Sequence, residues 1–533
     1  MRQRLGKAAG KKQGARSVLI GTFHGICLEF LKDQGEDFCL AGDGELKRLA
    51  GLAAEETGLS GSIKEFLEKV SRRKSGMTDM EETSGNSDSA WEETFENYEN
   101  RKKEKNLYDF DDLLLCAAER SEQGRIPEKW QKRFRYLLVD EFQDINPVQQ
   151  RLIRIWSSRG RELFVIGDPD QAIYGFRGAD PRCFDRLAEE NSNLEIIRLK
   201  ENYRSSPQII NAASALWNRN KREYLHSNCP DGVPVRLVKA GSSVGEAIFI
   251  AKEINRMAGG IGMLEAHQAA WKNGDRTLRG FGDIAVLCRT HRQADLVEMC
   301  LQKESIPYVR AGREEFLQDD MVQGSLAFFR YLADPEDTGA AQESADAVWK
   351  LEWNPVTEGI ISAAAETFRP LYKKKKPVKF IEEWIKEMQL ESSEPMRKLL
   401  QMTVFYSSMP EFMNILALGA EGDLKRASGR RYTAETVTVM TLHGSNGLEF
   451  PAVFIYGVNQ GSIPLEGGNG SGDPEEERRL FYVGMTRAKE ELILTTSGEP
   501  SGFVRDLDDG LIQRENVEKK KEEVCHQMSL FEL

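Results

Sequence analysis

Short apolar segments that end in polar or acidic residues recur along this chain, and they constrain its fold more than any other feature. Two of them, YLLV (136–139) and LFVIG (163–167), are each followed by carboxylates and are separated by a segment of helical length. A strand–helix–strand order of this kind is typical of a parallel sheet, whose functional side chains gather where the strands end. The sequence therefore predicts an α/β fold.

A second series of buried-type segments begins near residue 235 and predicts a second sheet. Its members are PVRLVKA (234–240), DIAVLCR (283–289), VTVMTL (437–442), AVFIYG (452–457) and ELILTTS (491–497). Between about 313 and 430 the pattern is helical, which indicates an insertion into the second sheet domain. Residues 72–93 have the Ser, Gly and acid content of a mobile loop.

The composition is that of a water-soluble protein of several domains. The chain has 533 residues, 40% of them hydrophobic, and a formal net charge of −12. An acidic chain does not attract nucleic acid as a whole, so a DNA-binding surface would have to be a local groove.

No apolar run is long enough to span a membrane, the basic N-terminus has no apolar core of a signal peptide, and the 8 cysteines are scattered. We therefore expect a cytoplasmic location and no membrane partner.

One sequence pattern occurs twice. VLIGTFHG (18–25) and VTVMTLHG (437–444) both read as an apolar strand followed by Thr-x-His-Gly. Two similar domains that each present a threonine and a histidine at a strand end could grip one polymer strand at two points. Coincidence between two short strands is the alternative.

The carboxylates after YLLV suit chemistry on a metal-bound nucleotide. Asp140 would hold Mg²⁺, and Glu141 would orient and deprotonate the attacking water. The alternative is structural, because acidic residues after a strand often cap the next helix.

The second acidic strand end carries an amide and aromatic residues. Gln171 follows the strand closely, and its side chain could hydrogen-bond a γ-phosphate or the attacking water. Tyr174, Phe176 and Arg177 come next, and aromatic residues beside an arginine can stack on bases at about 1–3 kcal/mol per base. Ordinary core aromatics are the alternative.

Two arginines complete the candidate chemistry. Arg204 lies beside Tyr203 in NYRSS, and Arg487 lies in YVGMTRAKEEL. Arginines that contact the transferred phosphoryl group accelerate hydrolysis by about 10³–10⁵-fold. For either arginine alone, a surface salt bridge is the alternative.

Taken together, these segments resemble the ordered motifs of the UvrD/Rep/PcrA-like superfamily 1 DNA helicases. The resemblance rests on TFHGICLEFL, YDFDDLLL, LLVDEFQD, IGDPDQAIYGFRGA, LKENYRSSPQIINAA, VTVMTLHGSNGLEFPAVF and EERRLFYVGMTRAK, which span nearly the whole chain in the family's order. It implies two RecA-like parallel-sheet domains of the P-loop NTPase type, each with an inserted helical subdomain. It also implies ATP-driven 3′–5′ translocation on single-stranded DNA and unwinding at junctions with duplex DNA, in repair or replication, with ATP as the only small-molecule substrate.

The resemblance also implies roles for individual residues. Asp140 (Mg²⁺), Glu141, Gln171, Arg204 and Arg487 would be catalytic, and Tyr203, Arg204, Glu449 and Arg487 would bind the nucleotide. The DNA track would include Thr22, His24, Tyr174, Phe176, Arg177, Thr441 and His443.

The implied domains follow the two series of strands. Residues 1–198 would form the first RecA-like domain, with a helical insertion at about 32–125. Residues 199–505 would form the second, with its insertion at about 313–430, and 506–533 would be a flexible tail.

The sequence departs from the family's pattern in three places. No G-x-x-x-x-G-K-[ST] phosphate loop occurs, and GKAAGKK (6–12) has neither the spacing nor a following Ser or Thr. We therefore expect the chain to begin after the family's phosphate loop and its ATPase to be compromised. Asn446 stands where the family usually has lysine. The insertion at 313–430 is short and has no Gly-Ile-Gly type of turn.

The C-terminal QMSLFEL (527–533) resembles the peptides that dock on bacterial sliding clamps. Gln527, Leu530 and Phe531 would be the contact residues. A merely apolar C-terminus is the alternative.

Three functions remain open at this point. The first is an ATP-dependent helicase, and the second is a non-catalytic helicase remnant that binds single-stranded DNA or the clamp. The third is the helicase half of a helicase–nuclease, which the short segment after the last motif disfavours.

Overall fold

The computed structural model describes most of the chain, in two compact units. The described residues are 18–76, 87–123, 126–175, 178–217, 225–259, 278–310, 317, 319–335, 337–403, 406, 408–419, 435–466, 473–505 and 507–517. Unit 1 comprises the chain up to Asp168 together with Tyr174–Arg186 and Arg313–Gly429. Unit 2 comprises Pro169–Ile173, Leu187–Gly312 and the chain from Arg430 onward.

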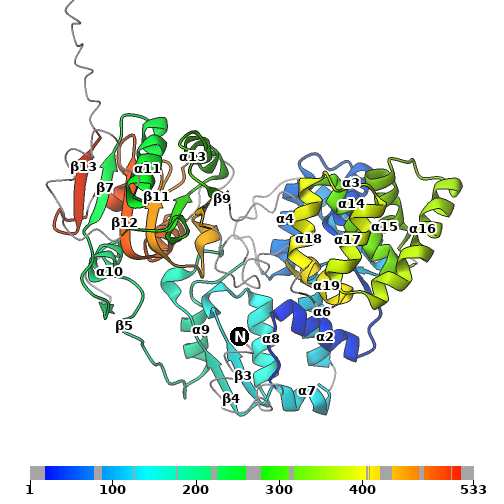
Figure 1. The fold of residues 1–533 in the computed structure, drawn as a ribbon. Coiled ribbons are helices and arrows are strands. Elements are labelled where there is room, and N and C mark those ends of the chain that lie inside the picture. Colours follow the sequence, from blue (N-terminus) through cyan, green and yellow to red (C-terminus); the bar gives the residue numbers. More distant parts are fainter. Residues whose placement is uncertain are drawn as a thin grey trace, which may run out of the picture. The chain divides into compact units, whose positions relative to one another are not determined.

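A small parallel sheet carries the acidic strand ends of unit 1 (Figure 1). Strands β3 (Tyr136–Val139) and β4 (Glu162–Val165) pair in parallel and are joined by helix α8 (Pro147–Ser157). Asn146 caps α8 in a reciprocal capping box with Gln149, and proline occupies the first turn, as favourable helix starts require. Val148, Leu152 and Trp156, spaced four residues apart, are buried in the core.

Further helices lie in the described N-terminal part of unit 1. They are α2 (Phe23–Asp33), α3 (Asp43–Thr57), α4 (Ile63–Lys74), α5 (Ser87–Glu104), α6 (Phe110–Gln123), α7 (Glu128–Arg133) and α9 (Cys183–Glu190), with a short parallel pair of β1 (Cys39–Leu40) and β2 (Leu107–Tyr108). The expected loop at 72–93 is shorter than predicted, because α4 continues to Lys74 and α5 begins at Ser87.

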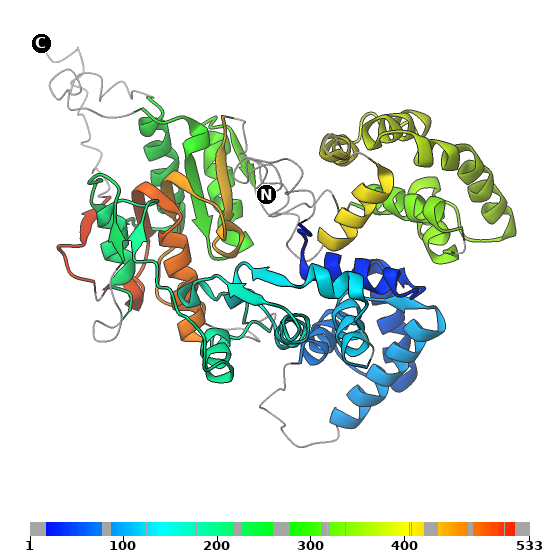
Figure 2. The same ribbon diagram turned by 90° about the horizontal axis from the view of Figure 1, so that it is seen from below.

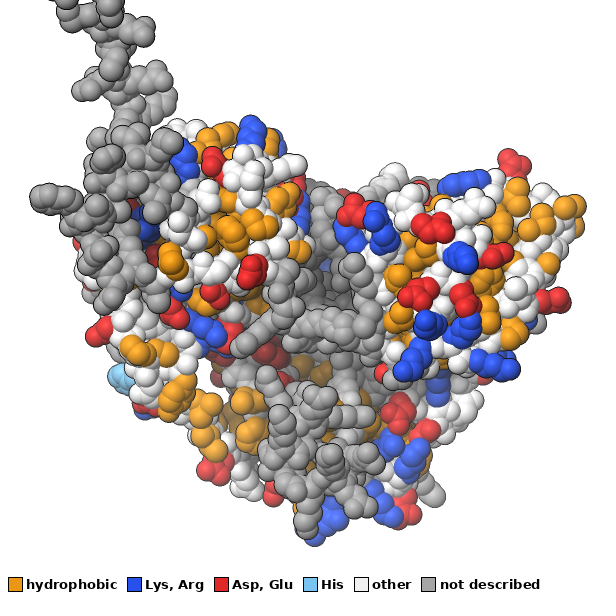
Figure 3. All heavy atoms as spheres, in the orientation of Figure 1, with side chains coloured by type: hydrophobic (Ala, Val, Ile, Leu, Met, Phe, Trp, Pro, Cys, Tyr) orange, Lys and Arg blue, Asp and Glu red, His pale blue; other side chains and the backbone are white. Residues whose placement is uncertain are grey.

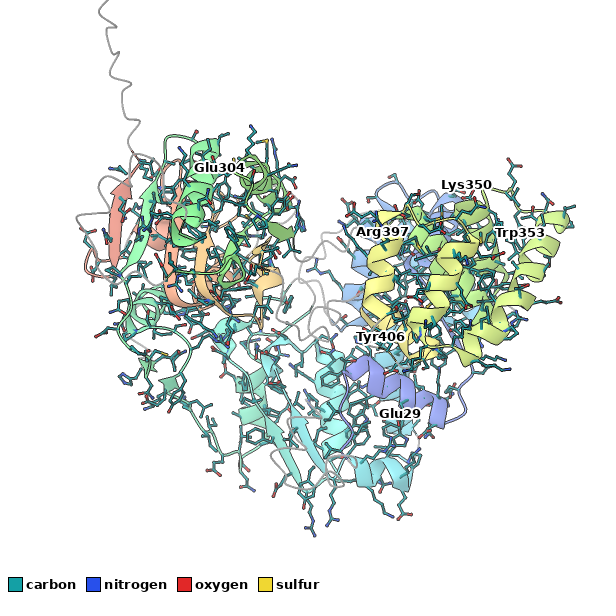
Figure 4. All side chains as sticks on the ribbon, in the orientation of Figure 1. Glu29, Glu304, Lys350, Trp353, Arg397 and Tyr406 are labelled. Carbon is teal, nitrogen blue, oxygen red and sulfur yellow. The ribbon has the colours of Figure 1, made fainter. Side chains whose placement is uncertain are left out.

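The second helical part of unit 1 is built around Trp384. Its helices are α14 (Asp320–Ala333), α15 (Thr338–Ser344), η7 (Ala345–Trp349), α16 (Pro355–Lys374), α17 (Pro377–Glu387), α18 (Glu394–Thr403) and α19 (Met409–Gly419). The Trp384 ring stacks on Phe328 at 4.8 Å, and its Nε1 donates to Ser325 Oγ at 3.0 Å. Lys350 and Arg397 lie on the outside of this bundle (Figure 4), and acidic and basic side chains are interspersed over the face seen in Figure 3.

Unit 2 is a seven-stranded sheet in the order β13-β7-β12-β11-β8-β10-β9, in which every neighbouring pair is parallel. The strands are β7 (Val235–Lys239), β8 (Ile284–Cys288), β9 (Tyr308–Arg310), β10 (Val437–Thr441), β11 (Phe450–Ile455), β12 (Ala488–Thr496) and β13 (Ile512–Asn516). A short separate pair is formed by β5 (Glu201–Asn202) and β6 (His226–Ser227). The helical segment α14–α19 enters the sequence between the adjacent strands β9 and β10.

Helices cover both faces of the large sheet, as parallel sheets require (Figures 1 and 2). On one face α11 (Ser243–Met257) and α13 (His291–Lys303) share an apolar core with Val286 and Phe454. On the other face α21 (Pro474–Met485) approaches so closely that a Cβ on Gly484 would lie 2.4 Å from Leu442 Cδ2. The predicted α/β fold with parallel sheet and helical insertions is confirmed.

One local expectation was wrong, and two edge strands were not predicted. Residues 18–22 form no strand, because nothing in the described chain pairs with them, and Thr22 instead caps α2. The edge strands β9 and β13 were not predicted, because they are short and only partly buried. Since β13 pairs with β7, the second sheet includes residues up to Asn516.

Candidate active site

The acids of unit 1 stand at the carboxyl ends of its two strands. Asp140 follows β3 directly and is exposed, and its Oδ1 accepts a hydrogen bond from the Glu141 main-chain N at 3.1 Å. Glu141 has φ 52° and ψ 48°, a left-handed conformation that non-glycine residues adopt at a cost and that is frequent at functional sites. Exposed carboxylates of this kind are suitable ligands for Mg²⁺. Asp140 stands where the sequence predicts the Mg²⁺ ligand and Glu141 where it predicts the general base, and both roles stay predictions.

The candidate phosphate contacts of unit 2 centre on a buried arginine. Arg487 is 1% exposed, so it is no surface salt bridge. Its Nε donates to the Val483 main-chain oxygen at 2.9 Å and its Nη1 to that of Leu448 at 3.3 Å. Its Nη2 donates to Gln171 Oε1 at 2.9 Å. The structure therefore brings together two side chains that the sequence placed 316 residues apart.

The segment that bears Gln171 is held at a second point. Arg479, on α21, donates through Nε to the Ala172 main-chain oxygen at 2.7 Å. Pro169–Ile173 belongs to unit 2, although Asp168 before it and Tyr174 after it belong to unit 1. Arg479 lies in α21 and Arg487 lies two residues after this helix ends. Both arginines therefore bind a short segment that is joined to unit 1 at each of its ends.

A second charged group of unit 2 surrounds Glu449. Arg204 Nε donates to Glu449 Oε2 at 2.9 Å, and Lys489 Nζ lies 2.7 Å from Glu449 Oε1. The Lys489 hydrogen bond, together with the charges of Lys489 and Arg204, lowers the pKa of the Glu449 carboxyl against the effect of its burial. Arg204 and Lys489 share the single carboxylate of Glu449, so the three side chains together carry a net charge of about +1 at neutral pH, which suits the binding of a phosphate. Tyr203, beside it, is 77% exposed and offers an open ring face.

These residues lie at the amino edge of the large sheet. Glu449 directly precedes β11 and Arg487 directly precedes β12, and the Phe450 main-chain N donates to the Arg487 oxygen at 2.9 Å. Thr441, in contrast, is the last residue of β10, at the carboxyl edge. At about 3.3 Å per residue, the five-residue strand spans roughly 16 Å. Within unit 2 the candidate nucleotide contacts and the candidate DNA contacts are thus separated by the length of a strand.

The repeated Thr-x-His-Gly sequence has the same local geometry in both places. Thr22 Oγ1 accepts a hydrogen bond from the Gly25 main-chain N at 3.2 Å, and Thr441 Oγ1 accepts one from the Gly444 main-chain N at 3.1 Å. In each case the threonine side chain closes the turn in which the histidine sits. His24 packs edge-on against Phe110 at 5.6 Å, and His443 opens the short helix η8 (His443–Ser445). Only this hydrogen bond is shared, because Thr441 ends strand β10 whereas Thr22 caps α2 without a strand before it.

Other predicted site residues are only partly placed. Tyr174 belongs to unit 1 and is half-buried. Phe176, Arg177 and the tail residues Gln527, Leu530 and Phe531 lie outside the described residues. The Nδ2 atom of Asn446, at the position where the family usually has lysine, is buried without a hydrogen-bond partner in the described part of the chain.

One acidic cluster elsewhere in unit 1 has the spacing of a metal site, but its carboxylates are paired with lysine side chains. The carboxylates of Glu99, Asp109 and Asp112 lie within 4.8 Å of one another. Lys74 Nζ lies 2.7 Å from an oxygen of each, and Lys102 Nζ lies 2.6–2.9 Å from the same three carboxylates. The two ammonium groups already occupy the place that a cation would take. This buried ion cluster is therefore a structural feature of the YDFDD segment.

The parallel sheet, its helical insertions and the charged groups at the strand ends define an α/β protein of the RecA-like type. The chain belongs to the UvrD/Rep helicase family: residues 1–192 match the UvrD/REP helicase N-terminal domain, and residues 197–403 and 358–499 match the UvrD-like helicase C-terminal domain.

Individual relatives agree with the family assignment. The chain is 27% identical over 575 residues to the ATP-dependent DNA helicase Rep of Salmonella typhimurium, covering 94% of this chain and 82% of that protein. It is 27% identical over 613 residues to the ATP-dependent DNA helicase PcrA of Bacillus subtilis, covering 98% and 79%. It is also 27% identical over 570 residues to DNA helicase II of Escherichia coli, covering 93% and 76%. The resemblance drawn from the motifs is confirmed.

No described helix combines the length and the apolar character needed to cross a bilayer.

Three residues with evident positions in these sites were missed in the sequence. They are Gln143, Arg479 and Lys489. Gln143 and Arg479 stand inside quoted motifs but were not singled out, because their partners are distant in sequence. Lys489 could have been found, because it lies only two residues beyond Arg487 and two residues before the predicted strand at 491–497.

Proposed function

We propose that this chain is a cytoplasmic, ATP-driven translocase that moves 3′ to 5′ along single-stranded DNA and unwinds DNA at single-strand/duplex junctions, in repair or replication. Membership of a helicase family supports the general activity. The observation that carries the proposal is the contact between Arg487 and Gln171, because it pairs the proposed phosphate-stabilising cation with the proposed nucleotide sensor.

The chemistry proposed for ATP divides between the two units. In unit 1, Asp140 would hold Mg²⁺, which neutralises charge on the phosphates when bound, and Glu141 would take the proton of the attacking water. In unit 2, Arg204 and Arg487 would stabilise the charge that develops on the γ-phosphoryl group. Because Arg487 Nη2 donates to Gln171 Oε1 in the structure, a γ-phosphate would compete for the same guanidinium. Gln171 would then respond to the presence of that phosphate, and Tyr203 would stack on the adenine.

The DNA would run over the two Thr-x-His-Gly turns. Thr22 and His24 in unit 1 and Thr441 and His443 in unit 2 would contact it, with Tyr174, Phe176 and Arg177 supplying stacking and charge. The segment 442–449 leads from the carboxyl edge to the amino edge of the large sheet. It is therefore the proposed connection between DNA contact and nucleotide contact in unit 2.

We expect slow ATP turnover from this chain, because none of its 533 residues form a G-x-x-x-x-G-K-[ST] sequence to grip the β- and γ-phosphates. Binding of single-stranded DNA should persist, because it depends on the other motifs. The measurement is ATP hydrolysis with and without single-stranded oligonucleotide, beside a fluorescence titration of the same oligonucleotide. Turnover near 10 s⁻¹, a typical enzyme value, would contradict the expectation. DNA binding with no turnover at all would favour the non-catalytic remnant instead.

We also propose that the C-terminal Gln527, Leu530 and Phe531 dock on a bacterial sliding clamp. Replacing Leu530 and Phe531 by alanine should abolish retention of the chain on an immobilised clamp, because two apolar anchors supply most of the affinity in such contacts. Oligonucleotide binding by the same variant is the control and should be unchanged. Equal retention of both forms would show that the tail is not the clamp contact.

A further inference from the structure

A buried glutamine connects the two acidic strand ends of unit 1. Gln143 is 0% exposed. Its Nε2 donates to Glu141 Oε2 at 2.7 Å, and its Oε1 accepts from the Asp168 main-chain N at 3.0 Å. One amide therefore holds the carboxylate that follows β3 and the main chain that follows β4.

Only one orientation of this amide satisfies both contacts. If the amide were turned over, its oxygen would face the Glu141 carboxylate and its NH₂ would face the Asp168 N–H group. Both contacts would then be repulsive, and both polar groups would be left unsatisfied in a buried place. The position requires a side chain that donates at one atom and accepts at the other, which a carboxylate, an alkyl chain or a thioether cannot do at neutral pH.

The space for the amide depends on the absence of a side chain at residue 167. A Cβ on Gly167 would lie 2.2 Å from Gln143 Oε1 and 2.9 Å from the Phe142 main-chain N. The Phe142 main-chain N is itself fixed, because it donates to the Ile166 oxygen at 3.0 Å. Residue 167 must therefore be a glycine, because the main chain after β4 passes close to the turn that carries Gln143.

We infer that Gln143 is a positioning residue that fixes the direction of the Glu141 carboxylate and ties it to the strand end leading to Gln171. The inference rests on the proposed function, in which Glu141 accepts the proton of the attacking water. Glu141 has a left-handed backbone conformation, and the hydrogen bond from Gln143 holds its side chain in that setting. Asp168, held by the same amide, lies three residues before Gln171, so displacement of that segment would be transmitted to the carboxylate.

The test compares Gln143→Met with Gln150→Met in the full chain. Gln150 is also buried and lies in the neighbouring α8, but its Nε2 has no hydrogen-bond partner in the described part of the chain. The two variants lose the same amide, and only Gln143→Met loses contacts to Glu141 and Asp168. We expect kcat of Gln143→Met to fall about 10- to 100-fold, the range found for residues that orient a functional side chain through a hydrogen bond, with KM for ATP changed less than about twofold. Gln150→Met should keep the wild-type kcat.

One further variant separates positioning from stability. Gly167→Ala should reproduce the fall in kcat, because its Cβ displaces the Gln143 amide without altering that side chain. A purely structural role would lower the amount of folded protein without lowering kcat per folded molecule.

A readout independent of turnover is amide hydrogen exchange over residues 163–170. Loss of protection at Asp168 in Gln143→Met and Gly167→Ala, but not in Gln150→Met, is the supporting result. Unchanged protection, or unchanged kcat in an active chain, would overturn the inference and leave the helicase proposal intact. Absence of turnover in the wild type would overturn the proposed function instead, and hydrogen exchange would still decide whether Gln143 holds Asp168.

Discussion

Replacing Glu141 by glutamine is expected to lower the rate of ATP hydrolysis about 10²- to 10⁴-fold, the usual contribution of a general base. The substitution preserves shape, and the glutamine oxygen can still accept the hydrogen bond that Gln143 Nε2 donates at 2.7 Å. What it removes is the ability to take a proton from water. Single-stranded DNA binding should be unchanged, because neither Glu141 nor its hydrogen-bond partner Gln143 belongs to the proposed DNA track.

The measurement is release of labelled phosphate from ATP under single-turnover conditions, which detects slow rates. Glu162→Gln is the matched control, because Glu162 is an exposed carboxylate at the amino end of β4, the opposite end of the same small sheet. The control should hydrolyse ATP at the wild-type rate. If Glu141→Gln retained more than a tenth of that rate, Glu141 would not be the base, and the roles assigned to both Glu141 and Gln143 would fall together.

The two arginine contacts in unit 2 suggest how such a site could report on its nucleotide. Arg479 holds the Ala172 main chain, and a main-chain contact of this kind does not depend on the ligand. Arg487 holds the Gln171 side chain, which can turn away. With a fixed anchor beside an exchangeable contact, a bound phosphate would replace the Gln171 contact while Arg479 still holds the segment. Since the chain on both sides of Pro169–Ile173 belongs to unit 1, a change there would be transmitted along the backbone.

Apolar strands were the most predictable part of the fold. The buried strands β8, β10, β11 and β12 lie within about three residues of the predicted segments. β3 also begins and ends at the residues expected from its apolar run, although its Tyr136 and Leu138 side chains are exposed. Strands buried on both faces are continuously apolar, so composition alone marks them. The edge strand β13 (IQREN) is polar and mostly exposed, and residues 18–22 are apolar yet unpaired. Whether such a segment is a strand depends on a partner that its own sequence does not specify.

The candidate site could be predicted residue by residue but not as a set of contacts. The acids and arginines were found because their chemistry and their motifs single them out. The contacts of Gln143 with Asp168 and of Arg479 with Ala172 join residues 25 and 307 positions apart. A glutamine that orients another side chain has no distinctive charge, so only the folded structure shows what it does.

The buried ion cluster of unit 1 gives the largest expected effect on stability. Lys74 and Lys102 are 7% and 1% exposed, and their ammonium groups share the carboxylates of Glu99, Asp109 and Asp112. Lys74→Met would leave three acids with one cation in a buried place. We expect it to lower the free energy of unfolding of unit 1 by about 3–5 kcal/mol, the usual cost of breaking a buried ion pair from one side.

Asp112→Asn is the matched comparison within the same cluster. Burial, and then the neighbouring Asp109, raise the pKa of Asp112, so its negative charge is poorly tolerated. The asparagine oxygen can still accept the hydrogen bond that the Asp109 main-chain N donates at 2.8 Å, but its NH₂ group then faces Lys74 Nζ in place of Oδ1. The change leaves two cations with two carboxylates, and we expect the free energy of unfolding to fall by about 1–3 kcal/mol, less than in Lys74→Met. Urea unfolding followed by hydrogen exchange in α5 and α6 assigns each effect to unit 1.

The sign of the pH dependence follows from the shifts in the cluster. Burial acts against ionised Asp109, but Lys74 and Lys102 outweigh it and hold the pKa of Asp109 well below its ordinary value. Burial also acts against charged Lys74, but Asp109, Asp112 and Glu99 outweigh it and raise the pKa of Lys74. A depressed carboxyl pKa stabilises the fold above the unfolded value of about 3.9, and a raised lysine pKa stabilises it below about 10.4. The deficit of Lys74→Met should therefore be full between about pH 5 and pH 9 and should shrink as the pH falls below about 4. A deficit that stayed constant down to pH 3 would mean that the cost is lost packing around Lys74 and not lost charge pairing.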